Sequence, residues 1–574
     1  MITGKPLSAV KFSNLNEMLA AAARTEHGIT FVDLQEQESW VSYGEVYQQA
    51  RRMAHRLIQI GVQPGDRVGI GIPTSPNFAT AFFGTLLAGA VPAPLYPSPR
   101  VGRLTDYYAN ITRMLNAVGT RLILADAHTF TVLKPAAEMA RPALGCRMLE
   151  ELLPDTATDE AEVPVEPGML GLIQFSSGST NTPKGIALPH RSLVNQTHMM
   201  ATILTEDGAE GHKIVSWMPL YHDFGLIGCF LTAIYMQVPL IIMSADTFIT
   251  QPRLWLRAIS RHGGTITMAP NFAYELCLRR IPDAELETLR LHTLRHALNG
   301  AEPVSASMME AFSARFARCG LKQQGVLQPV YGLAEATLTV SYPPTPRAPV
   351  HSLRVDDSAL AQAGCIVPGK RKLASCGGAM PGVSIQIRDE AGTELPDRRV
   401  GRIFVKTSSP MQGYFNNPEA TAQALFGEWL YTGDLGFIAD GELYICGRVK
   451  DLVIIRGANH PAELFEESLH RVAGVRPGWA VAAGFIPPNS ESEELLILAE
   501  RNSDSSAEDA LVEKEIRKVL LDATGVRAHT IVMLPKGTLR RTSSGKIRRQ
   551  DALQRFLSGE LLQTQPMLRP TGTS

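Results

Sequence analysis

The chain has 574 residues, which is too many for one hydrophobic core, so we expect several domain-sized units. Apolar content of 45% and charged content of 19% are typical of a globular protein, and a formal net charge of -1 excludes a global field that would attract nucleic acid or an anionic membrane. The seven cysteines are scattered without a C-x-x-C pair, which argues against a disulfide or metal framework and favours a reducing compartment.

The N-terminal residues lack the apolar core of a signal peptide. One later stretch, residues 225–243, is apolar and long enough to cross a bilayer. Gln237 and Pro239 interrupt it, so we interpret it as a buried helix followed by a strand. We therefore expect a cytoplasmic protein without a transmembrane segment.

Strand and helix patterns alternate through most of the chain, which predicts an α/β fold. Ser42 and Glu45 form a capping box that opens an amphipathic helix, and Gly61 ends it. A buried strand over 67–72 and a helix over 77–90 follow.

The pattern of expected strands and helices changes near residue 450. Before it, segments 382–389, 402–407 and 442–448 have β character. After it, we predict a helix from about 461, strands near 479–486 and 494–501, a charged helix over 506–522 and a strand over 530–535. We therefore expect a body of residues 1–448 and a small separate domain of residues 449–574. Segment 341–372 is Pro-rich at its start and irregular throughout, and we interpret it as an insertion.

The stretch 174–190, QFSSGSTNTPKGIALPH, combines hydroxyls, a glycine and a lysine, as a phosphate-binding loop does. It lacks the Gly-Lys-Ser/Thr order of a P-loop, and strand-like sequence follows the lysine, so the loop should join two strands. A polar surface hairpin is the alternative interpretation. The candidate phosphate-binding residues are Ser176, Ser177, Gly178, Ser179, Thr180 and Lys184.

Three other motifs of the body carry polar residues that could act in chemistry. His222 and Asp223 precede an apolar run, where a satisfied core histidine is the commoner outcome. Glu335, in YGLAEATL, suits a hard cation bound with phosphates, but an ordinary glutamate at a helix start is equally compatible. Asp434, in YTGDLG, suits either a turn, which we favour, or the hydroxyls of a ribose.

The last two motifs lie at and beyond the domain boundary. Arg448 and Lys450, in GRVKD, resemble a solvated linker. The stretch 536–550 carries six basic residues but no aromatic residue for stacking on bases, so RNA binding is disfavoured. Lys546, in TSSGK, is a point charge on a long stem that suits developing negative charge.

Taken together and in this order, the motifs SSGSTNTPKG, YGLAEATL, YTGDLG, GRVKD and TSSGKIRR resemble the adenylate-forming superfamily of acyl-CoA synthetases, luciferases and peptide-synthetase adenylation domains. The stretches WMPLYHDFGLIG, APNFAYELC and NGAEPV are most similar to those of fatty acyl-AMP ligases. The resemblance covers residues 15 to 556 or so. It implies a large body with two α/β sheet subdomains and a β-rich subdomain, followed by a small α+β C-terminal domain.

The resemblance also implies a role for each candidate residue. The loop from Ser176 to Thr180, with Lys184, would cover the β- and γ-phosphates of ATP, and Lys546 would reach the carboxylate and the α-phosphate. His222 would lie near the reacting carboxylate, and Lys450 would be the hinge on which the small domain rotates. The remaining implied roles are adenine binding for Gly300, Ala301, Glu302 and Tyr331, Mg²⁺ binding for Glu335, ribose binding for Asp434 and Arg448, and the acyl tunnel for Phe224, Leu226 and Phe272.

The implied reaction is the ATP-dependent activation of a medium- or long-chain fatty acid to an acyl-adenylate, with release of pyrophosphate. Transfer to an acyl carrier protein of a polyketide or peptide synthase would follow, and segment 341–372 is where the insertion of acyl-AMP ligases is expected. The alternatives are a fatty acyl-CoA synthetase and a non-catalytic relic that binds adenylate or a carrier protein. One departure concerns the stretch after the hinge, NHPAELFEESL, which differs from the family pattern and bears on how the small domain docks.

Overall fold

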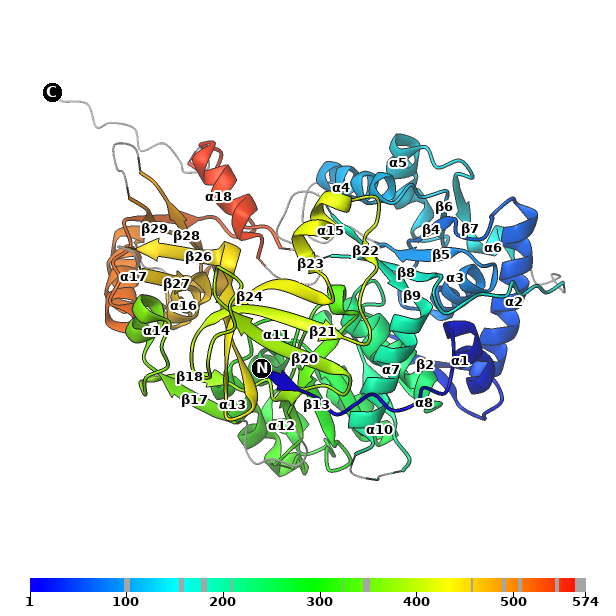
Figure 1. Cartoon of the computed structure of the whole chain (residues 1–574), viewed down its shortest axis with the longest axis horizontal. Coiled ribbons are helices and arrows are strands. Elements are labelled where there is room, and N and C mark those ends of the chain that lie inside the picture. The colour runs from blue at the N-terminus through cyan, green and yellow to red at the C-terminus, as the bar shows by residue number, and fades with distance from the viewer. Residues whose placement is uncertain are drawn as a thin grey trace.

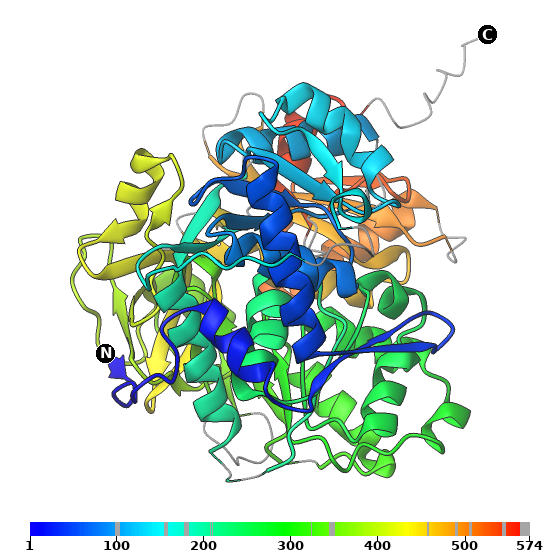
Figure 2. The same ribbon diagram turned by 90° about the vertical axis from the view of Figure 1, so that its right-hand side faces the viewer.

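The computed structural model describes residues 1–97, 104–153, 159–176, 183–206, 208, 210–322, 324–343, 351–455, 458–487, 492–503, 508–541 and 547–562. Figure 1 shows a broad body, blue to yellow, with the orange and red C-terminal elements at its left-hand end. In Figure 2 the blue and green regions of the body lie one above the other, and the yellow β-rich region lies beside them. The α/β body with a smaller C-terminal domain agrees with the fold predicted from the sequence.

The largest sheet has seven strands and is parallel except for its edge strand β3. Its central strands consist almost wholly of buried residues, as expected for a parallel sheet covered by helices on both faces. In spatial order they are β14 (Leu327–Pro329), β13 (His296–Asn299), β12 (Ile266–Ala269), β10 (Ile214–Ser216), β11 (Leu240–Met243), β2 (Gly28–Val32) and β3 (Glu38–Ser42). Its associated helices include α1 (Leu15–Ala22), α7 (His190–Leu204), α9 (Ala245–Thr250), α10 (Arg253–His262), α11 (Asn271–Arg280), α12 (Asp283–Leu286) and α13 (Ala306–Phe316).

A second parallel sheet has four strands in the order β5-β4-β6-β7. The expected capping box is present, since Ser42 accepts from the Glu45 N–H and the Glu45 carboxylate accepts from the Ser42 N–H. On the helix that follows, Val46, Ala50, Met53 and Leu57 are buried, whereas Ile58 is 37% exposed and does not face the core. The elements are α2 (Tyr43–Gln59), β4 (Arg67–Ile70), α3 (Pro76–Leu87), β5 (Val91–Pro94), α4 (Leu104–Ala117), β6 (Leu122–Ala125), α5 (Phe130–Ala140), β7 (Cys146–Met148) and α6 (Leu149–Leu152).

The long apolar stretch near residue 230 is buried within the body. It forms the π-helix η1 (Phe224–Leu231), then α8 (Thr232–Met236) and then β11, which is the helix-then-strand order expected from Gln237 and Pro239. In the described part of the chain, no helix has both the length and the apolar character that a bilayer crossing requires.

The β-rich region is an antiparallel sheet built around β20 (Val383–Arg388), β21 (Gly401–Thr407), β24 (Trp429–Ala439) and β25 (Glu442–Arg448), with β1 (Ile2–Thr3) and β23 (Leu425–Phe426) at its edges. The favoured turn at YTGDLG is wrong, because these residues lie inside β24. Gly433 has a φ of +77°, and the pairing of β24 shifts register on both sides of this region. The glycines therefore mark a strand irregularity rather than a chain reversal.

Segment 341–372 has more regular structure than expected. It contains β17 (Ser352–Val355) and α14 (Asp357–Ala363), and it ends in β18 (Arg371–Ala374), which pairs with β17. Its two ends meet, since β16 (Thr339–Tyr342) pairs with β19 (Gly378–Ala379). The segment is therefore an excursion from the body that returns to its starting point.

The C-terminal domain has its own hydrophobic cores on the two faces of the sheet β28-β29-β30. The predicted strands and helices are present with bounds shifted by a few residues, and β30 is parallel to β29. The elements are η4 (Val449–Asp451), β26 (Leu452–Ile455), β27 (Ala458–Pro461), α16 (Ala462–Ser468), β28 (Val475–Phe485), β29 (Glu494–Arg501), α17 (Asp509–Thr524), β30 (Thr530–Leu534) and α18 (Arg549–Leu557).

Candidate active site

A cavity lies at the carboxyl ends of the strands of the large sheet, where parallel sheets commonly bind ligands. His222 follows β10, Ala301 follows β13 and Val330 follows β14, so three parallel strands of one sheet deliver residues to the same edge. The β-rich sheet and the hinge close the other side. The candidate residues that line this cavity are Ser176, Lys184, His222, Phe224, Ala301, Glu335, Asp434, Arg448 and Lys450.

The two ends of the candidate phosphate loop come from an antiparallel strand pair. Strand β8 (Leu170–Phe175) precedes it and β9 (Gly185–Pro189) follows it, as the sequence predicted. Ser176 donates its backbone N–H to the Lys184 carbonyl at 3.0 Å, which closes the base of the loop. Ser177, Gly178, Ser179 and Thr180 lie outside the described residues.

Glu335 lies in the single helical turn η3 (Ala334–Ala336) at the wall of the cavity. The Tyr414 hydroxyl donates to its Oε1 atom at 2.8 Å. Burial raises the pKa of the Glu335 carboxyl, and the Tyr414 hydrogen bond opposes that rise. A buried carboxylate that faces a polar cavity is suited to bind a cation.

Thr337, two residues further on, has a φ of +69°, which is strained for a β-branched residue. Its hydroxyl donates to the Ser409 carbonyl at 2.6 Å. This hydrogen bond holds the turn against a segment 72 residues away, so the position of Glu335 depends on tertiary structure.

Asp434 and Arg448 face each other across β24 and β25, where they are direct register partners. Arg448 Nε donates to Asp434 Oδ1 at 3.1 Å, and the Tyr331 hydroxyl donates to Oδ2 at 2.7 Å. The carboxylate beside it raises the pKa of the Arg448 guanidinium, which is consistent with a persistent ion pair. The pair leaves Asp434 on the cavity wall with lone pairs for further donors.

His222 is held at the cavity by its neighbours. Its Nδ1 lies 2.7 Å from Asp223 Oδ1, and Asp223 also accepts the Phe224 backbone N–H at 2.7 Å at the start of η1. A π-helix is uncommon and often marks a functional position. The core-histidine interpretation is therefore wrong, because His222 lines the cavity instead of packing inside the body.

Five candidates are not on the cavity wall. Gly300, Glu302, Tyr331, Leu226 and Phe272 are absent from its lining. Glu302 instead accepts the Phe272 N–H at 2.6 Å at the N-terminus of α11. Tyr331 is buried behind the wall with its hydroxyl on Asp434, so it orients that carboxylate in this structure.

Lys546 lies outside the described residues, but its flanks are placed. Arg541 and Ile547, on either side of it, form an isolated antiparallel bridge. Arg541 interacts electrostatically with Glu302, which follows the cavity residue Ala301. Arg541, five residues before Lys546, therefore lies on the side of the C-terminal domain that faces the cavity region of the body.

The sequence interpretation missed Tyr414. It lies in β22 (Gly413–Tyr414), contacts Glu335 through its hydroxyl, and has Lys184 Nζ 4.6 Å from its ring centroid. The stretch GYFNNP, with aromatic residues among turn formers, was the only local signal for it.

Groups of three or more His, Cys, Asp or Glu residues that could hold a metal do not occur among the described residues. Mg²⁺ that arrives with a nucleotide needs only one or two protein carboxylates, because phosphates and water supply the other ligands. Glu335 provides one such carboxylate on the cavity wall, so the residues fit a nucleotide-borne cation.

Comparison with known proteins assigns the family. Residues 19–415 match the protein family described as AMP-binding enzyme. A Caulobacter vibrioides protein, named provisionally as an acyl-CoA synthetase, is 34% identical over 96% of each chain. The medium-chain fatty acid–acyl carrier protein ligase JamA of Moorena producens is 32% identical over 99% of each chain.

A solved structure from a study of fatty acyl-adenylate ligases of E. coli and L. pneumophila superposes with a TM-score of 0.89 at 30% identity. The match covers 97% of this chain and 100% of the other, so both the body and the C-terminal domain have counterparts. The chain therefore belongs to the AMP-binding enzyme family of adenylate-forming ligases and is similar to its fatty acyl-AMP ligases.

Proposed function

We propose that this protein activates a medium- or long-chain fatty acid with ATP, releases pyrophosphate and passes the acyl group from the acyl-adenylate to an acyl carrier protein. The observation that carries this proposal is the grouping of Lys184, Glu335, Asp434, Arg448 and His222 around one cavity. The similarity to JamA and to fatty acyl-adenylate ligases supports the substrate and the acceptor.

The chemistry requires charge neutralisation and positioning more than acid–base catalysis. A carboxylate oxygen attacks the α-phosphorus of ATP while the bond to pyrophosphate breaks, and both reactants are anionic. The carboxylate is already ionised at neutral pH, so no general base is needed. Asp434, with Arg448, holds the ribose, Lys184 binds the departing phosphates, and Lys546 meets the reacting centre.

Glu335 would hold Mg²⁺ together with the polyphosphate. Bound there, the cation would supply neutralisation of phosphate charge. Ser176, Lys184 and Glu335 line the same cavity, and together they would face the triphosphate. The loop from Ser177 to Thr180 would cover the phosphates from the solvent side.

The acyl group would enter past His222 and Phe224, which line the cavity. Phe272 lies beyond them and packs edge-on against Trp217, with ring centroids 5.9 Å apart. Leu226, on the buried η1 helix, borders the same apolar interior. Ala301, which lines the cavity, would lie along the adenine, and Tyr331 would act from behind Asp434.

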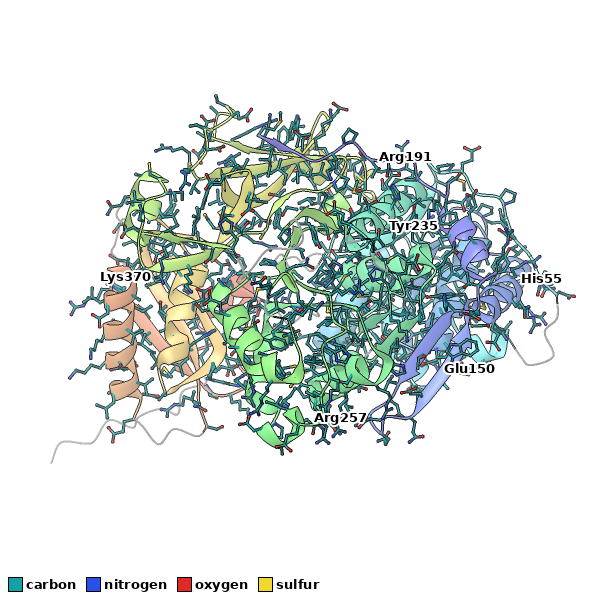
Figure 3. The ribbon with its side chains drawn as sticks, turned by 90° about the horizontal axis from the view of Figure 1, so that it is seen from below. His55, Glu150, Arg191, Tyr235, Arg257 and Lys370 are labelled. Atoms are coloured by element: carbon teal, nitrogen blue, oxygen red, sulfur yellow. The ribbon has the colours of Figure 1, made fainter. Side chains whose placement is uncertain are left out.

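The choice of carrier protein over coenzyme A rests on segment 341–372. Lys372 pairs with Glu310 of α13 in the body at 2.7 Å. On its other side, α14 packs against β27, and Glu467 of the C-terminal domain interacts electrostatically with Arg371. Figure 3 shows Lys370 of this segment next to the C-terminal domain. We infer that the segment braces the small domain, residues 449–574, and limits its rotation about Lys450.

ATP–pyrophosphate exchange tests the adenylation step. We expect exchange that depends on fatty acid across a chain-length series, and its loss in Lys546→Ala. Absence of exchange in the unmodified protein with every fatty acid would favour the non-catalytic relic instead.

The acceptor is tested by comparing acyl-carrier-protein and acyl-CoA products. Because Tyr342 pairs with Gly378, residues 344–372 can be replaced by a short Gly-Ser link without separating β16 from β19. The intact protein should load the carrier protein and form little acyl-CoA, and the shortened protein should gain acyl-CoA formation. Robust acyl-CoA formation by the intact protein would instead support an acyl-CoA synthetase.

A further inference from the structure

Tyr414 contacts the two charged residues that the proposed function assigns to the polyphosphate. Its hydroxyl donates to Glu335 Oε1 at 2.8 Å, and Lys184 Nζ lies 4.6 Å from its ring centroid. Lys184 and Glu335 are 151 positions apart in the sequence, and Tyr414 is 79 positions from Glu335. Only the folded chain brings the three together.

The backbone around Tyr414 joins the same two places. The Gln412 and Phe415 N–H groups donate to the Ala187 and Gly185 carbonyls at 2.8 and 2.7 Å, which pairs this segment with β9 directly after Lys184. The Met411 N–H donates to the Glu335 carbonyl at 3.1 Å. One short segment therefore connects the end of the phosphate loop to the turn that carries the carboxylate.

The position of Tyr414 is itself held by the next helix. Thr421 Oγ1, in α15 (Pro418–Ala424), accepts the Tyr414 N–H at 2.9 Å. Gly413 has a φ of +143°, and a Cβ atom there would lie 2.8 Å from the Thr421 side chain. The chain therefore approaches α15 closely at Gly413, which fixes the direction of the tyrosine ring.

The arrangement separates two opposite charges that would otherwise attract each other. A direct Lys184–Glu335 ion pair would neutralise both groups and remove them from a ligand. The ring attracts the ammonium to its face, while the hydroxyl occupies only one of the several acceptor sites of the carboxylate. Tyr414 thus satisfies both side chains without cancelling their charges.

We propose that Tyr414 is a positioning residue that orients the Glu335 carboxylate and keeps Lys184 from pairing with it, so that both remain available to a nucleotide polyphosphate and its divalent cation. This inference rests on the proposed function for the identity of the ligand. It assigns no bond-making role to the phenol.

Two substitutions separate the two contacts. Tyr414→Phe removes the hydroxyl and keeps the ring, and Tyr414→Leu removes both. Tyr47 offers a matched control, because its hydroxyl donates to Glu162 at 2.8 Å and Arg51 lies 5.7 Å from its ring centroid, on helix α2 of the body surface. Tyr47→Phe and Tyr47→Leu therefore remove the same chemistry outside the cavity.

The measurement is ATP binding by titration calorimetry, with and without Mg²⁺, followed by ATP–pyrophosphate exchange against Mg²⁺ concentration. We expect Tyr414→Phe to weaken ATP binding about two- to tenfold in Mg²⁺ only, with a matching rise in the half-saturating Mg²⁺ concentration. Tyr414→Leu should also weaken metal-free ATP binding, by about threefold, because Lys184 is then free to pair with Glu335. The Tyr47 variants should bind ATP as the unmodified protein does.

Equal losses with and without Mg²⁺ in Tyr414→Phe, or binding unchanged in both Tyr414 variants, would overturn the proposal. Thermal unfolding of each variant identifies any loss that comes from misfolding, and Tyr414→Phe is the variant least disturbed in packing. If the unmodified protein binds Mg-ATP but shows no exchange with any fatty acid, the proposed function fails. The comparison of ATP binding with and without Mg²⁺ still tests the role of Tyr414 in that case.

Discussion

The charged residues at the cavity of the body are arranged differently from those around Arg549 in the C-terminal domain. In the body, Glu335 and Asp434 are held at the cavity by partners from distant segments, and each keeps a side toward the open space. In the C-terminal domain, Arg549 Nη1 and Nε lie 2.7 Å from Asp451 and Glu466, respectively. Arg549 also lies 2.9 Å from Glu463.

The difference indicates that the two sets of charged residues have different roles. The Glu335 and Asp434 carboxylates of the body both face the cavity, where Glu335 is held by the uncharged Tyr414 hydroxyl and Asp434 by Arg448 and Tyr331. Charges in the C-terminal domain satisfy one another around the hinge and α18, so the domain keeps its internal structure without help from the body. Such a unit suits a domain that rotates while carrying Lys546, and the predictions below test this division.

The largest effect is expected for Arg549→Met. It leaves three carboxylates, Asp451, Glu463 and Glu466, without their shared cation, all with side chains no more than 16% exposed. The free energy of unfolding of the C-terminal domain should fall by about 3–5 kcal/mol. Calorimetry should show its transition at lower temperature and that of the body unchanged.

Arg501→Met is the matched control, because the Arg501–Asp509 pair of the same domain is exposed. It should change the unfolding free energy by less than about 1 kcal/mol. Equal shifts of both transitions in Arg549→Met would contradict the independence of the C-terminal domain.

Glu335→Gln should have the next largest effect, on activity. The amide keeps the shape but loses the charge that faces the cavity, so ATP–pyrophosphate exchange should fall about 10²- to 10³-fold. Thermal unfolding should change little. Glu162→Gln, at the exposed partner of Tyr47, serves as control, and a Glu335→Gln rate close to that of the unmodified protein would argue against cation binding there.

A pH effect on stability is expected from His190 in the body. Burial lowers its pKa to about 4, and its Nδ1 accepts the Leu15 N–H at 3.3 Å. Below the ordinary histidine pKa the unfolded chain binds a proton that the folded chain does not, so stability is lost as the pH falls from about 6.5 to 4. The loss should be about 2 kcal/mol at pH 5 and about 3 kcal/mol at pH 4, and urea unfolding at pH 7, pH 5 and pH 4 measures it. His190→Gln should flatten this dependence, and an unchanged slope would refute the assignment.

The smallest effect is expected for an ion pair that joins the C-terminal domain to the body. Arg540 lies 3.2 Å from Asp106 of α4, and both side chains are more than one-third exposed. A double-mutant cycle with Asp106→Asn and Arg540→Gln should give a coupling of about 0.2–1 kcal/mol. A coupling far above that range would mean that the pair locks the small domain onto the body.

Local patterns predicted much of this fold because they act over a few residues. The capping box at Ser42, the strand-loop-strand at 174–190 and the helix-then-strand near residue 230 were all confirmed. The turn at YTGDLG was wrong because glycine and aspartate have the same local preferences in a strand irregularity as in a turn, and only pairing with β21 and β25 distinguishes them.

The sequence by itself determined the identity and order of the motifs, and with them the adenylate-forming character of the chain. The change in the strand and helix pattern near residue 450 also predicted where the small domain begins. Tertiary structure alone decided which side chains meet. Tyr414 reaches Glu335 and Lys184 because three separate segments pair through backbone hydrogen bonds, and Tyr331 contacts Asp434 from behind the cavity instead of lining it. Such contacts join residues some 80 to 230 positions apart, a distance over which local sequence preferences carry no information.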